Sequence, residues 1–148
     1  MFKAITHFFE RYIVINVQDE DSEEKIRVAS AALFMEMMHA EEICSGEKLQ
    51  LIATLVENNF NLTEEQTLAL MAIAEQKRQQ ATDYFEFTHL INDGFSREQK
   101  IHLIEALWKI ALVDNHLEID EEYLIDKIAR LLIIPRPEVL QAKIRAAG

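Results

Sequence analysis

The scarcity of glycine and proline most constrains the fold of this chain: three glycines and two prolines occur in 148 residues. β-Sandwiches and β-barrels need many tight turns, and these two residue types favour such turns. Hydrophobic residues make up 49% of the chain and charged residues 28%, which is the balance of a protein with a packed core. No apolar and polar alternation of period two persists. We therefore expect an all-α protein, a compact bundle of about seven or eight short helices.

The spacing of apolar residues predicts one short docking helix followed by a single helical domain. Residues 1–18 form the predicted N-terminal docking helix, and residues 22–148 form the domain. Five carboxylates in residues 19–24 are expected to make a solvated linker and a helix start. The docking helix either closes its own domain or docks into a second copy. Its apolar residues recur at helical spacing: Phe2, Ile5, Phe8, Phe9, Tyr12 and Ile13.

Capping and helix-breaking residues predict where several helices begin and end. Thr63 and Ser96 each precede a glutamine by three positions, which is the capping-box spacing at a helix start. Gly94 follows Asn92 and Asp93 and is expected to end a short helix, because it tolerates left-handed geometry. Pro135 prevents the helix before it from continuing.

The charge of the chain restricts its partners. The formal net charge is −11, which argues against nucleic acid and anionic membrane surfaces and favours cations or basic partners. A single cysteine, Cys44, cannot form an internal disulfide, and no apolar run suits a signal peptide or direct membrane insertion. We expect a cytoplasmic protein that binds a partner protein or forms a homodimer. The basic residues of the last 22 positions serve acidic surfaces of the same or another chain, or solvate a helix face.

An internal repeat relates two helical hairpins. Residues 32–55 resemble residues 106–129, so that Phe34 matches Trp108 and Glu47 matches Glu121. Each copy contains a helix, an acidic corner and a second helix, and such a duplication predicts that the two corners are neighbours. The first corner is the weaker one, because Ala40 stands opposite Asp114. Its acidic residues are Glu41, Glu42 and Glu47.

The second corner is a candidate site for a divalent cation. Six acidic residues and no lysine or arginine occur from Asp114 to Asp126. Oxygen donors in this segment favour Ca²⁺ or Mg²⁺ over Zn²⁺. An EF-hand is excluded, because Ile119 stands where its loop needs glycine. In the alternative interpretation, the acidic residues only favour a helix N-terminus. The candidate oxygen donors are Asp114, Asn115, Glu118 and Asp120.

Two Glu-x-x-His pairs raise an enzymatic alternative. Glu36 with His39, and Glu86 with His89, have the spacing that points two ligands the same way on a helix. Two such pairs, with a glutamate from each of two further helices, bind the metals of di-iron carboxylate enzymes. His89 falls in a helix of about two turns, and the other helices offer no clear partner glutamates. The alternative interpretation places both histidines at helix ends, where imidazole bonds terminal carbonyls.

The second half of the chain resembles the TerB-like proteins, the tellurite-resistance B family. The matching residues are Tyr84-Phe85-Glu86-Phe87-Thr88, Leu103, Glu105, Leu107, Trp108, Ala111, Val113-Asp114, Leu117, Glu121, Leu124-Ile125, Ile128-Ala129 and Leu131-Leu132. Residues 31–66 resemble the first half of that family, so the similarity covers roughly residues 22–134.

This resemblance implies an all-α cytoplasmic domain that is not an enzyme, has acidic corners proposed to bind metal ions, and is associated with stress and tellurite resistance. By position it adds Glu121 to the candidate metal ligands beside Asp114. Asn115 stands where the family usually has glycine, and Ala40 or Glu41 stands where it usually has aspartate. We therefore expect a non-catalytic module that binds divalent cations, a partner protein or both.

Overall fold

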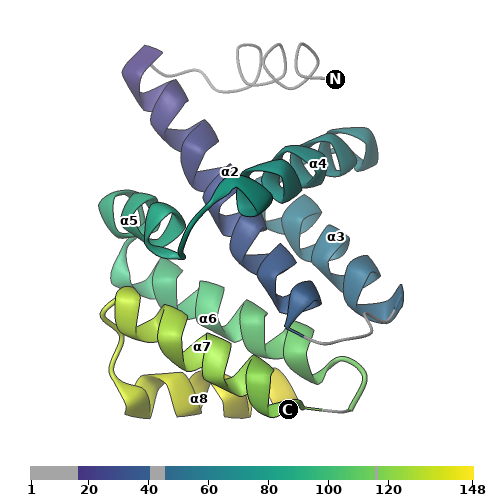
Figure 1. Cartoon of the computed structure of the whole chain (residues 1–148), viewed down its shortest axis with the longest axis vertical. Helices are drawn as coiled ribbons and strands as arrows, with labels where there is room; N and C mark the ends of the chain where they lie inside the picture. Colours follow the sequence, from purple (N-terminus) through teal and green to yellow (C-terminus); the bar gives the residue numbers. More distant parts are fainter. Residues whose placement is uncertain (1–16, 41–45, 116) are drawn as a thin grey trace.

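The computed structural model describes residues 17–40, 46–115 and 117–148. This part of the chain folds into seven helices and contains no strand, which confirms the predicted all-α class (Figure 1). The predicted docking stripe and the first-corner residues Glu41 and Glu42 lie outside the described residues. The helices are α2 (Val17–His39), α3 (Gly46–Phe60), α4 (Glu64–Gln80), α5 (Phe85–Gly94), α6 (Arg97–Leu112), α7 (Ile119–Leu131) and α8 (Arg136–Ala147).

Helices α2 and α6 are the two central elements of the bundle. Helices α3, α4 and α5 pack against α2, whereas α7 and α8 pack against α6, and the two central helices contact each other (Figure 1). These are also the first helices of the two repeat copies. The matched residues Phe34 and Trp108 are both fully buried, one in each copy. The duplication in the sequence therefore supplies the two helices that form the centre of the core.

Trp108 anchors α8 to α6. Its Nε1 donates a hydrogen bond of 3.1 Å to the carbonyl oxygen of Val139, and Lys143 Nζ lies 5.1 Å from the centre of its ring. A buried indole needs such a partner for its N–H, because an unpaired polar group in the core is costly. Met35, Met37 and Met71 are also buried and belong to this core.

Both predicted capping boxes are present. The N–H of Gln66 donates to Thr63 Oγ1 at 3.2 Å, and the N–H of Thr63 donates to Gln66 Oε1 at 2.9 Å. Ser96 and Gln99 make the same two bonds at the start of α6. Each box satisfies two N–H groups that a helix start otherwise leaves without partners.

The expected linker at residues 19–24 is wrong, because α2 begins at Val17 and includes the whole acidic run. The acidic run therefore belongs to the first turns of a long helix.

Gly94 ends α5 as expected, but it does not do so through left-handed geometry. No described glycine has a positive φ, and Gly94 is the last residue of α5. A Cβ atom built on Gly94 would lie only 2.0 Å from Ile26 Cδ1. The absence of a side chain at Gly94 leaves room for the Ile26 side chain of α2, and the backbone there does not need left-handed geometry.

Candidate functional site

The second acidic corner is the loop from α6 to α7. Asn115 has φ of 59°, in the left-handed region, and its N–H donates to the Leu112 carbonyl oxygen at 3.0 Å. Glycine adopts this region most readily, and asparagine tolerates it better than most other residues. This explains why asparagine can replace the glycine that the family resemblance leads one to expect at this position.

Glu118 and Glu121 define the start of α7. The N–H of Glu118 donates to Glu121 Oε1 at 3.1 Å, so Glu121 caps the helix from its third position. Glu121 is fully buried, unlike its repeat partner Glu47, which is exposed. The second corner therefore contains one buried carboxylate, that of Glu121.

A buried ion pair joins the helix starts that follow the two corners. Lys48, in the first turn of α3, donates from Nζ to Glu121 Oε2 at 2.5 Å, and both side chains are 0% exposed. A buried charge is tolerated when it is paired with good geometry and further hydrogen bonds. This contact agrees with the prediction that the corners are neighbours. It also places the ammonium group of Lys48 against the carboxylate of Glu121.

The burial of Lys48 was not predicted from the sequence, although the spacing of residues on α3 indicates it. Lys48, Ile52 and Val56 recur every four residues on α3, and all three are buried. A lysine within such a stripe faces the core, so it needs a carboxylate partner there. Glu121 is that partner.

Two further acidic residues of the corner region pair with the basic C-terminal segment. Lys143 Nζ lies 3.6 Å from Glu122 Oε1, and Arg136 forms an ion pair with Asp126. These basic residues serve acidic groups of the same chain. The charge of the segment from Asp114 to Asp126 is therefore partly balanced within the protein.

The first turns of α7 also present an exposed face, which we call the α7 face: Ile119, Asp120 and Tyr123. Ile119 is 83% exposed and Tyr123 is 62% exposed, and they lie four residues apart on the same side of the helix. Asp120 lies beside them and is also exposed. Ile119 has the largest exposed fraction among the large hydrophobic residues that the structure describes.

A cavity of about 270 Å³ adjoins the α7 face. Lys127 Nζ lies 5.2 Å from the centre of the Tyr84 ring, and burial raises the pKa of Tyr84, so that its hydroxyl stays protonated and can donate. The cavity lies between α2, α7 and the start of α5. Its lining residues are Glu36, His39, Ala40, Tyr84, Asp120, Tyr123, Leu124 and Lys127.

The first Glu-x-x-His pair faces α4. His39 Nε2 lies 3.1 Å from Glu75 Oε2, and Arg78 Nη1 donates to Glu36 Oε1 at 3.3 Å. Arg78 also donates to Glu75, which lowers the pKa of that carboxyl group. These four side chains form one network between α2 and α4.

The second pair lies on the exposed side of α5. Glu86 is exposed, and His89 stacks on Phe85 with ring centres 5.5 Å apart. His89 Nε2 also lies 3.6 Å from Asp93 Oδ2 on the same helix. The two pairs thus contact different partners.

The candidate cation ligands do not form a cluster of three or more His, Cys, Asp or Glu side chains that could hold a metal ion within the described residues 17–40, 46–115 and 117–148. Both carboxylate oxygens of Glu121 already accept hydrogen bonds, from Lys48 and from the N–H of Glu118. Both oxygens of Glu121 therefore have partners within the protein.

The fold and the corner define a class, an all-helical domain with a duplicated hairpin and an acidic loop before α7. The sequence model of the family described as tellurite resistance protein TerB matches residues 27–144. The chain belongs to the TerB family. No curated protein and no solved structure matches the chain. None of the described helices combines the length and apolar character needed to cross a membrane.

Proposed function

We propose that this TerB-family chain is a non-catalytic cytoplasmic module whose α7 face holds a basic segment of a partner protein. The main observation that supports this proposal is that Ile119 and Tyr123 are exposed on successive turns of α7, with Asp120 between them. Exposed apolar side chains next to acidic groups suit a partner segment that is both apolar and basic, because charge complementarity orients the partner and excludes acidic competitors.

The buried pair supports this proposal indirectly. Lys48 and Glu121 tie the start of α7 to the start of α3, so the first turn of α7 rests on the core. A rigid helix start lowers the entropy that ordering of a binding surface would otherwise cost. The α7 face is therefore preorganised.

Site-specific photo-crosslinking in cells tests the proposal. A photoreactive residue at Ile119 should capture one protein, through a segment with net positive charge, and Asp120→Lys should abolish the capture. The matched control position is Leu68, which is also exposed but lies on α4. Equal capture from Leu68, or capture that survives Asp120→Lys, would contradict the proposal.

Cation binding is a second candidate for the same corner. Asp114, Asn115, Glu118 and Asp120 offer oxygen donors within one loop and helix start, and they could act without Glu121. The observation that favours this candidate is the left-handed Asn115, which turns the chain between donors.

The physiological setting is part of the proposal. The family description refers to tellurite resistance, and we extend that setting, as a stress response, to this chain. Cells that lack the protein should grow less well with tellurite. Wild-type protein should restore growth and Asp120→Lys should not, whereas unchanged growth of the deletion strain would contradict this setting.

A further inference from the structure

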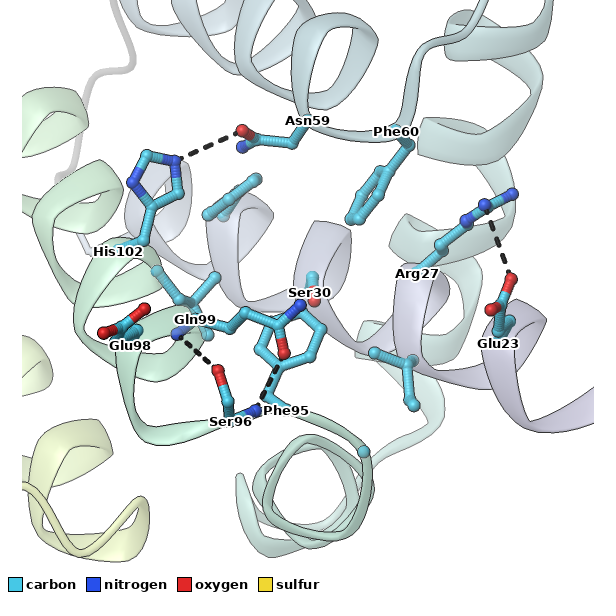
Figure 2. Close-up of a pocket in the computed structure, with 14 residues that line it drawn as sticks. Glu23, Arg27, Ser30, Asn59, Phe60, Phe95, Ser96, Glu98, Gln99 and His102 are labelled. Atoms are coloured by element: carbon cyan, nitrogen blue, oxygen red, sulfur yellow. Dashed lines mark hydrogen bonds and ion pairs between the residues drawn. The ribbon is translucent and has the colours of Figure 1, made fainter. Parts of the chain in front are cut away.

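A second hollow lies far from the α7 face in the fold, between α2, the end of α3 and the start of α6. We call it the α2 groove, and its volume is about 750 Å³ (Figure 2). Figure 2 shows Ser30, Phe60 and Phe95 around the hollow, with Arg27 and His102 toward opposite sides. Its apolar lining residues are Ile26, Phe34, Phe60, Phe95 and Leu103. This volume is in the range of grooves that bind ligands.

Ser30 gives an independent sign that the α2 groove receives something. Its side chain is buried, and its Oγ has no hydrogen-bond partner among the described residues. Buried polar groups are nearly always hydrogen-bonded, and leaving one without a partner costs about 1 to 3 kcal/mol. An occupant with hydrogen-bonding groups would remove this penalty.

We propose that residues 2–13 of the same chain form a helix that docks in the α2 groove. The apolar stripe of this segment suits the aromatic lining, and the segment immediately precedes α2. With Lys3, Glu10 and Arg11, residues 1–16 carry a net charge of +1, whereas Glu23, Arg27 and Glu98 give the groove lining a net charge of −1. The segment and the groove are therefore complementary in apolar surface and opposite in net charge.

The lengths of the two segments agree. At about 1.5 Å per residue, a helix of residues 2–13 is about 18 Å long, and the wall from Glu23 to Phe34 spans about 17 Å. The four steps from Ile13 to Val17 reach about 13 Å when extended, which lets the segment fold back antiparallel to α2. This register sets Thr6 and His7 opposite Ser30. Both carry groups that can pair with a hydroxyl.

Paramagnetic NMR on the full chain tests the proposal. In a Cys44→Ser background, a spin label on Glu98→Cys lies in the groove wall, and a label on Leu68→Cys is the control on α4. The Glu98 label should remove most of the amide signal intensity of residues 2–13, and the Leu68 label should not. Phe8→Asp should restore the lost signals, while the amide spectrum of residues 22–148 shows that the domain stays folded.

A mixed sample distinguishes the possible occupants. When ¹⁵N-labelled chains without spin label are mixed with spin-labelled chains without ¹⁵N, docking within one chain predicts no loss of signal. Equal loss in the mixed sample would overturn the proposal in favour of a second copy. Full intensity for residues 2–13 in the doubly labelled chain would overturn docking in the α2 groove altogether.

Discussion

Lys48 Nζ lies 2.5 Å from Glu121 Oε2, although the two residues are 73 positions apart in the sequence, and neither side chain is exposed. The pair joins the second helices of the two repeated hairpins. The carboxylate also caps α7 through the N–H of Glu118. One glutamate therefore fixes both the position and the start of the helix that presents the proposed binding face.

Removal of one partner of this pair should be strongly destabilising. Lys48→Met leaves the Glu121 carboxylate buried without its ammonium partner, so we expect the free energy of unfolding to fall by about 3 to 5 kcal/mol. Lys48→Met with Glu121→Leu should recover much of this loss, because both charges are then gone. Urea unfolding measures each variant. The control is Glu47→Gln at the exposed neighbour, and additive losses in the double variant would contradict a buried pair.

Gly94→Ala should destabilise the protein although alanine is the better helix former. The added Cβ would meet Ile26 Cδ1, and such overpacking costs about 1 to 3 kcal/mol, more than the gain of about 1 kcal/mol in helix propensity. Ile26→Val removes the clashing Cδ1 atom and should rescue Gly94→Ala. Gly46→Ala is the control, because nothing lies within 4 Å of its Cβ position. Thermal unfolding that is unchanged in Gly94→Ala would contradict the predicted overpacking and show that the Ile26 side chain moves aside without loss of stability.

The ion-pair network between α2 and α4 should make the free energy of unfolding decrease as the pH falls into the acid range. The hydrogen bond from Arg78 is the largest cause that lowers the pKa of Glu75. A carboxyl group with a lowered folded-state pKa contributes stability that is fully present above its unfolded pKa and is lost as pH falls through the folded value. Arg78→Gln should therefore flatten the fall in urea midpoint below the ordinary glutamate pKa. An acid profile identical to that of the wild type would contradict this role for Arg78.

Divalent cations should stabilise the chain more than sodium if the corner binds them. A ligand at about 100 times its Kd adds about 2.7 kcal/mol, which raises the Tm of a chain of this length by about 5 to 10 °C. We predict that CaCl₂ or MgCl₂ raises the Tm more than NaCl of equal ionic strength, and that Asp114→Asn removes the excess. Calorimetry measures the Tm. Equal Tm shifts with both salts would contradict specific cation binding, because charge screening at the corner would then explain the whole effect.

The sequence predicted those parts of the structure that depend on local signals. The boxes at Thr63 and Ser96, the all-α class and the family follow from residue spacing, which does not require knowledge of distant contacts. The role of Gly94 and the partner of Lys48 depend on which helices pack together. Residue types within the single segments around 48 and 94 do not specify those neighbours. Only the fold supplies them.

The candidate site shows the same division. The acidic loop and its left-handed Asn115 could be found from the sequence and the family pattern. The burial of Glu121 could not, because its repeat partner Glu47 is exposed on an equivalent helix turn. The exposure of Ile119 could not be predicted from the sequence either. Isoleucine is among the residues most often buried, so its residue type alone favours a position in the core.

Binding of a basic amphipathic peptide by the full chain tests the central claim most directly. The probe is a synthetic helix with lysine on one face and leucine on the other, followed by ¹H–¹⁵N NMR titration. The account predicts shifts centred on Ile119, Asp120 and Tyr123, affinity that falls with added NaCl, and loss of binding in Asp120→Lys with the fold intact. Shifts spread evenly over acidic surfaces, or binding that is unchanged by Asp120→Lys, would contradict it.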